Sequence, residues 1–138
     1  MGEWIFIMAM DMIIPIIMLV VSQMFIKKIP KHINSIVGYR TTMSMKNKET
    51  WKFAHEYCGK LWRIHGGIML AISIIVMLLV LGKGKESIAI VGGVLCSLQC
   101  IWLVVTIIPV EKALRKNFDK NGNRKVQSDM IKSREKDL

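Results

Sequence analysis

The sequence predicts an all-α integral membrane protein with three transmembrane helices. Three apolar runs cover residues 4–26, 61–81 and 88–110. At about 1.5 Å per residue, each is long enough to cross a hydrocarbon core about 30 Å thick. The flanks are basic, and 20 Lys and Arg against 10 Asp and Glu leave a net charge of +10. This combination is typical of proteins whose cations face anionic lipid headgroups.

The bilayer is therefore the first expected partner. Nucleic acid is the competing explanation for a strongly basic chain. We do not expect a nucleic-acid partner, because much of the positive charge lies within about 20 residues of the end of a span, where charge sets orientation.

Residues 4–26 form the first predicted span. Trp4 suits the headgroup layer at one end, and Lys27 and Lys28 anchor the other. A cleavable signal peptide is not indicated, because Glu3 replaces a basic leading region and the apolar run is too long.

Charge asymmetry predicts the orientation of the chain. Residues 27–63 carry nine Lys or Arg against Glu49 and Glu56, whereas Glu3 is the one charged side chain before the first span. By the positive-inside rule, this connector and the basic C-terminus are cytoplasmic and the N-terminus is outside. The sequence thus predicts a multi-pass protein of the cell membrane.

The long connector contains a second helical pattern over residues 44–60. Ser44 is placed to cap its first turn, and an apolar stripe at helical spacing comprises Trp51, Ala54, Cys58, Leu61 and Trp62. Such a helix can lie in the headgroup plane, or its stripe can pack on neighbouring protein. Residues 1–118 then form the membrane domain, and residues 119–138 a mobile, basic cytoplasmic tail.

Catalytic, metal and cofactor sites are not predicted. Cys96 and Cys100 are four residues apart in an apolar run, as small hydrophobes on one helix face, and lack further ligands. Trp51 and His55 are one turn apart, with Cys58 on the same side, and complete no ligand set or triad. We therefore expect a non-enzymatic protein.

One acidic residue, Asp11, lies inside a predicted span. An ionisable group at this depth should face the bundle interior. At about 1.5 Å per residue, Asp11, Ser73 and Ser97 lie roughly 10–14 Å below the outer ends of their helices, with Gln99 somewhat deeper. These residues predict either a polar site open to the outer face, for an ion or a toxin peptide, or hydrogen bonds between helices. Snorkelling of Asp11 to the outer headgroups is a further alternative.

Arg40 is the second candidate for recognition. It follows Gly38 and Tyr39, and the glycine permits an unusual backbone conformation. Its guanidinium can hold a phosphate or carboxylate bidentately, so the partner is a headgroup, an acidic group of another protein, or a carboxylate such as Glu56. A simple interfacial anchor is the alternative.

An ordered set of residues resembles the signature of the SdpI family, membrane proteins named for immunity to a secreted sporulation-delaying toxin. The set comprises Pro30, Asn34, Gly38, Tyr39, Arg40, Thr41, Ser44, Trp51, His55, Gly59, Lys60 and Leu61. It spans roughly a quarter of the chain, and the predicted helices around it agree in placement. Family members often have proline after the Arg-Thr pair, where this chain has Thr42.

The resemblance implies an immunity or sensor-type protein that protects its host from a membrane-active toxin peptide. It also implies a cytoplasmic regulator as a second partner, because some family members sequester a transcriptional repressor. The binding residues would be Asn34, Gly38, Tyr39, Arg40, Thr41, Trp51 and His55. A small transporter that works as a homo-oligomer, with Asp11 as its coupling carboxylate, is the alternative function.

Overall fold

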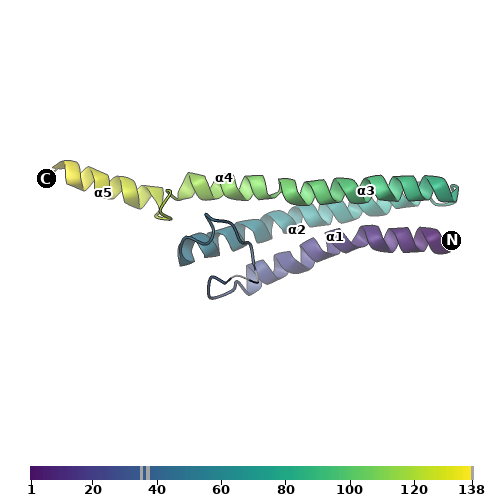
Figure 1. Cartoon of the computed structure of the whole chain (residues 1–138), viewed down its shortest axis with the longest axis horizontal. Helices are drawn as coiled ribbons and strands as arrows, with labels where there is room; N and C mark the ends of the chain where they lie inside the picture. The colour runs from purple at the N-terminus through teal and green to yellow at the C-terminus, as the bar shows by residue number, and fades with distance from the viewer. Residues whose placement is uncertain (35, 37, 138) are drawn as a thin grey trace.

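The computed structural model describes residues 1–34, 36 and 38–137, and in these residues the chain is helical without a β-strand. Three of the helices are long and apolar enough to span a membrane (Figure 1). The predicted all-α class is therefore confirmed. The helices are α1 (Gly2–Lys27), α2 (Lys48–Leu79), α3 (Lys85–Val105), α4 (Ile107–Asn117) and α5 (Lys125–Asp137).

The two helices α1 and α2 form the most closely packed pair. The buried residues of α1 recur at alternating spacings of four and three, which places them on one stripe; they are Asp11, Pro15, Met18, Ser22 and Phe25. Across this stripe, α2 supplies glycines. A Cβ at Gly59 would lie 3.2 Å from the Ser22 carbonyl oxygen, and a Cβ at Gly66 would lie 3.2 Å from the Met18 side chain. Small residues thus bring the two backbones together.

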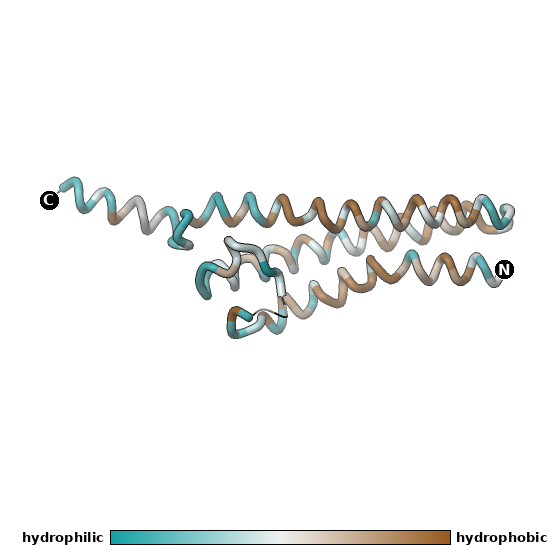
Figure 2. The backbone as a smooth tube through the Cα atoms, viewed as in Figure 1, coloured by the Kyte–Doolittle hydropathy of each residue, from teal (hydrophilic) through white to brown (hydrophobic). Residues whose placement is uncertain are grey.

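Hydrophobic residues predominate along the middle of the three long helices (Figure 2). Many isoleucines, leucines and valines of α1, α2 and α3 are exposed, as expected for side chains that face lipid. Polar residues gather at the two ends of the bundle. This distribution fits a membrane protein and would be costly in water.

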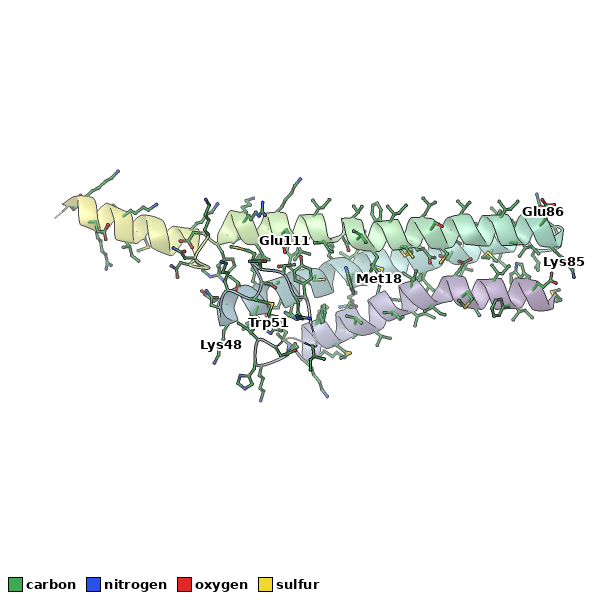
Figure 3. All side chains as sticks on the ribbon, in the orientation of Figure 1. Met18, Lys48, Trp51, Lys85, Glu86 and Glu111 are labelled. Carbon is green, nitrogen blue, oxygen red and sulfur yellow. The ribbon has the colours of Figure 1, made fainter. Side chains whose placement is uncertain are left out.

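At one end of the bundle, α1 meets the turn between α2 and α3. Trp4 donates a hydrogen bond of 2.8 Å from Nε1 to the Met77 carbonyl, and Lys85 lies 2.9 Å from Glu3. The opposite end carries the α1–α2 loop, α4 and α5 (Figures 1 and 3). The long loop and the C-terminal segment therefore share one side of the bundle, as the sequence predicted.

The predicted interfacial helix and second span are one continuous helix, α2. It begins at Lys48 rather than Ser44, because Asn47 is the cap: its side chain accepts from the Thr50 N–H at 2.9 Å, and the Thr50 hydroxyl accepts from the Asn47 N–H at 3.0 Å. No proline interrupts the helix at residue 60, and Gly59 fits within it as a packing residue.

The third apolar run is divided at Thr106 between α3 and α4. Pro109 explains the division, because it lacks an N–H and its ring clashes with the carbonyl four residues earlier. The Thr106 hydroxyl donates to the Leu103 carbonyl at 2.6 Å and accepts from Trp62 Nε1 at 3.0 Å. At the break between α3 and α4, the Thr106 hydroxyl therefore links α3 to α2 by hydrogen bonds.

The predicted C-terminal tail begins with a hydrogen-bonded turn. Asp119 Oδ1 accepts hydrogen bonds of 2.9 Å from the backbone N–H groups of Asn121 and Asn123. Asn47 donates to the Gly122 carbonyl at 2.6 Å, so this turn is docked on the start of α2. Beyond it, α5 extends away from the bundle (Figure 1).

Candidate functional site

Tyr39 joins three separate parts of the chain. It is buried in the α1–α2 loop, and its backbone N–H donates a 3.0 Å hydrogen bond to Nε2 of His55 on α2. Its hydroxyl donates a 2.8 Å bond to Oε1 of Glu111 on α4. Burial, and the neighbouring carboxylate of Glu111, raise the pKa of Tyr39 above its ordinary value, which keeps the hydroxyl protonated as a donor.

His55 is fully buried, and its two ring nitrogens have different roles. Nδ1 lies 2.7 Å from the Trp51 carbonyl oxygen, which can only accept, so Nδ1 carries the hydrogen. Nε2 accepts from Tyr39, which requires an unprotonated nitrogen. This geometry assigns the neutral Nδ1–H form.

Gly38 is required beside this histidine. Its φ is +116°, a conformation that L side chains rarely adopt. A Cβ at this position would also collide with Nε2 of His55 and lie 3.1 Å from the Trp51 ring. Glycine therefore permits the close approach of the loop to α2.

Trp51 fastens the start of the loop to α2. Its indole Nε1–H donates to the Pro30 carbonyl at 2.8 Å, and its ring centre lies 4.3 Å from that of His55. Phe25 of α1 meets the other side of His55 edge-on at 4.8 Å. The aromatic cluster thus unites α1, the loop and α2.

Ser44 organises the second half of the loop instead of capping α2. Its Oγ accepts from the Thr41 N–H at 2.8 Å, and its hydroxyl lies 3.0 Å from the carbonyl oxygens of Tyr39 and Thr41. The Thr41 hydroxyl in turn accepts from the Ser44 N–H at 3.2 Å. These bonds satisfy the backbone where the loop turns toward α2.

The predicted binding residues divide into a buried and an exposed set. Trp51 and His55 are 2% and 0% exposed, so they do not form a docking surface themselves, because the aromatic stripe packs on α1 and the loop. Asn34 accepts from the Ile36 N–H at 3.0 Å in a local turn. Arg40 is exposed, beside a cavity of about 320 Å³ that Phe25 and other residues line. Among the described side chains, Glu56 pairs with Lys52 at 4.0 Å rather than with Arg40.

Three of the four polar residues predicted within the membrane are joined by hydrogen bonds. The Gln99 side-chain amide donates to the Asp11 carbonyl at 3.0 Å and to the Ser73 hydroxyl at 2.7 Å. We call Asp11, Ser73 and Gln99 the intramembrane cluster. Ser97 does not join it, because it faces outward and its hydroxyl donates to the Gly93 carbonyl at 2.8 Å. Two residues along a helix turn the side chain by about 200°.

Two buried acceptor oxygens of this cluster have no hydrogen-bond partner among the described residues: Oδ2 of Asp11 and Oε1 of Gln99. A Cβ at Gly92 of α3 would lie 3.3 Å from Oδ2 of Asp11, so α3 passes close to the carboxylate. Unpaired acceptors at membrane depth are costly. They mark a place where a donor group or a proton can bind.

An open apolar cavity of about 510 Å³ lies between α2 and α3 beside this cluster. Ser73 and Gln99 contribute to its lining, as do His65 and Trp102, which are joined by a 3.0 Å hydrogen bond from the indole Nε1–H to Nδ1. The rest of the lining is mostly aliphatic. The cavity can take an apolar group that carries a hydrogen-bonding function.

Glu111 was not among the site residues predicted from the sequence. It is the one carboxylate between Glu86 and Asp119, immediately after the third apolar run. An isolated acid where basic residues dominate is a usable signal, but its partner Tyr39 lies 72 positions earlier.

Comparison with known protein families gives one match. The model of the SdpI/YfhL protein family matches residues 31–110, more than half of the chain and a segment that includes the loop, α2 and α3. The protein therefore belongs to the SdpI/YfhL family. Neither curated proteins nor solved structures gave a match.

Proposed function

We propose that this protein is an immunity or sensor-type membrane protein that protects its host from a membrane-active toxin peptide. Membership of the SdpI/YfhL family carries the proposal. In this proposal the protein acts by binding rather than by catalysis. The α1–α2 loop and α4 face the cytoplasm, and the helical bundle meets the toxin within the bilayer.

The cavity between α2 and α3 supports toxin binding from the membrane. It is mostly apolar, which suits a membrane-active peptide, and Ser73 and Gln99 offer polar groups at its wall. The Oε1 of Gln99 is buried and unpaired, so it can accept a hydrogen bond from a peptide donor that displaces the groups covering it.

The bonds of Tyr39 to α2 and α4 support a second step, in which toxin binding is signalled to a cytoplasmic regulator. Because one residue bonds to both α2 and α4, a change in the packing of these helices alters the loop directly. Arg40 follows it and is exposed, so a movement of Tyr39 changes the position of a guanidinium that a regulator can recognise.

A protection assay tests this proposal. Cells sensitive to the toxin are compared with and without expression of the protein, which should restore growth. Arg40→Ala should abolish protection at unchanged membrane abundance, whereas Lys31→Ala, an exposed cation of the same loop, should retain it. Equal protection by both variants would contradict a working role for Arg40.

A second candidate function is transport by an oligomer, with Asp11 as the coupling carboxylate. The unpaired Oδ2 of Asp11 supports it, because a buried carboxylate without a donor is suited to bind and release a proton. Proton flux into vesicles should then vanish with Asp11→Asn and persist with Ser97→Ala. Absence of flux under every imposed gradient would reject transport.

A further inference from the structure

A basic cavity of about 860 Å³ lies at the end of the bundle that carries α4. Its lining comes from the α1–α2 loop, α4, the turn after α4 and the start of α5. Its cations are Lys46, Arg115, Lys120 and Lys125. Two carboxylates, Glu111 and Asp119, share the lining.

The two carboxylates are already engaged within the protein. Glu111 accepts from the Tyr39 hydroxyl, and Asp119 accepts from two backbone N–H groups of its own turn. Neither forms an ion pair with the cavity's cations among the described residues. Four exposed cations thus line a space whose two acids are bonded elsewhere, which leaves a net positive site.

The position of the cavity identifies the kind of anion. Residues 87–110 carry no charged side chain, and Glu111 is the first one after that run. The cavity therefore begins where the chain leaves its apolar stretch, which is the level of lipid phosphates. Ile107 and Ile108, one turn earlier, are exposed on the lipid-facing surface.

From this arrangement we infer that the cavity binds the phosphate headgroup of an anionic membrane phospholipid. Arg115 can hold two phosphate oxygens in a bidentate contact, and Lys46 adds charge from the facing loop. The acyl chains then run along the exposed face of Ile107 and Ile108. A basic site followed along the same helix by exposed apolar residues matches a phospholipid better than an acidic peptide, which has no acyl chain. This inference is independent of the immunity function.

Native mass spectrometry of the purified full-length protein in a neutral detergent tests the inference. Phosphatidylglycerol and phosphatidylcholine with the same acyl chains are added separately. Phosphatidylglycerol should be retained at least about tenfold more strongly, since each cation near a lipid surface adds roughly a factor of five to binding. Equal retention of the two lipids would overturn the inference.

Matched variants distinguish binding in the cavity from a general effect of the positive charge of the protein. Lys46→Gln combined with Arg115→Gln should reduce phosphatidylglycerol retention at least about tenfold. Lys112→Gln combined with Lys116→Gln removes the same charge from exposed positions of α4 outside the cavity lining and should reduce retention much less than the first pair does. Equal losses from both pairs would contradict a specific site. If the first pair fails to fold, Lys120→Gln, at an exposed turn residue, should still weaken retention, and no effect would count against the cavity.

Two competitors distinguish the source of the anion. Inorganic phosphate should displace the lipid poorly, because it lacks acyl chains. Binding of inorganic phosphate without preference for phosphatidylglycerol would assign a free-anion site and overturn the inference. If an acidic peptide bound in an Arg115-dependent way and excluded the lipid, the site would be assigned to a protein partner, and the inference would likewise be overturned.

Discussion

The backbone N–H of Tyr39 donates a 3.0 Å hydrogen bond to Nε2 of His55, sixteen residues later in the chain. Because His55 Nδ1 is committed to the Trp51 carbonyl, the imidazole joins the loop and α2 only in its neutral form. The loop is thus held by a buried bond to its backbone, independent of the Tyr39 side chain.

Gly38→Ala should destabilise the protein by more than about 2 kcal/mol, because it combines an unfavourable φ with a collision against His55. Thermal unfolding in detergent measures the effect. Gly82→Ala is the matched control, since Gly82 also has a positive φ of +83° but meets nothing within 4 Å. Equal destabilisation by both would show that backbone strain alone accounts for the loss.

Tyr39 should resist ionisation. Its pKa is raised above the ordinary value of 10.0, so the stability that its protonated hydroxyl contributes is fully present below about pH 10 and is lost as the pH rises through the folded-state pKa. In a Tyr57→Phe variant, Tyr39 is the one remaining tyrosine. Its phenolate absorbance should appear well above pH 10 or together with unfolding. Ionisation near pH 10 in the folded protein would contradict the burial of Tyr39 together with its bond to Glu111.

Gln99→Leu should destabilise the bundle by about 0.5–1.5 kcal/mol, because it removes two bonds from the intramembrane cluster while also removing an unpaired oxygen. Ser97→Ala, on the outward face of the same helix, should have almost no effect. Unfolding in mixed detergent micelles compares the two. A larger loss from Ser97→Ala would place the polar site on the wrong face of α3.

Much of the fold could be predicted from the sequence because apolar runs of bilayer length have few alternatives. The run of residues 4–26 and the basic loop after it were enough for the first span and the shared side of loop and tail. The boundary at residue 60 was not predictable, since the change from an amphipathic to an apolar pattern does not end a helix that lacks a stop signal. The sequence did not predict that Ser97 lies outside the intramembrane cluster, because an estimate of depth from residue number does not tell which face of the helix a side chain occupies.

The sequence predicted which residues belong to the candidate site but not which of them contact one another or are buried. Gly38 and His55 were singled out by their order in the chain, and the structure brings them into contact. For Trp51 and His55 the sequence left two alternatives, a docking surface and a packed aromatic stripe. The structure has the packed stripe. Local spacing could not decide between them, because it does not tell which neighbour covers a stripe. The pairing of Tyr39 with Glu111 carries no local signal at all, since it depends on how α4 leaves the third span.

Orientation has a direct chemical check. Cys58 is buried and cannot report on it, so an engineered cysteine is needed on each side. An impermeant thiol reagent outside intact cells should label Lys85→Cys and miss Lys120→Cys, both of which replace exposed residues. The reverse pattern would place the α1–α2 loop outside the cell.

Toxin protection by Tyr39→Phe and Tyr57→Phe at equal membrane abundance tests most directly whether the Tyr39–Glu111 bond is needed for function. The first variant keeps the ring and the backbone bond to His55 but loses the 2.8 Å bond to Glu111, whereas the second changes an exposed hydroxyl on α2. Tyr39→Phe should lose most protection, whereas Tyr57→Phe should protect as the unaltered protein does. Full protection by Tyr39→Phe would contradict a functional role for the Tyr39–Glu111 bond.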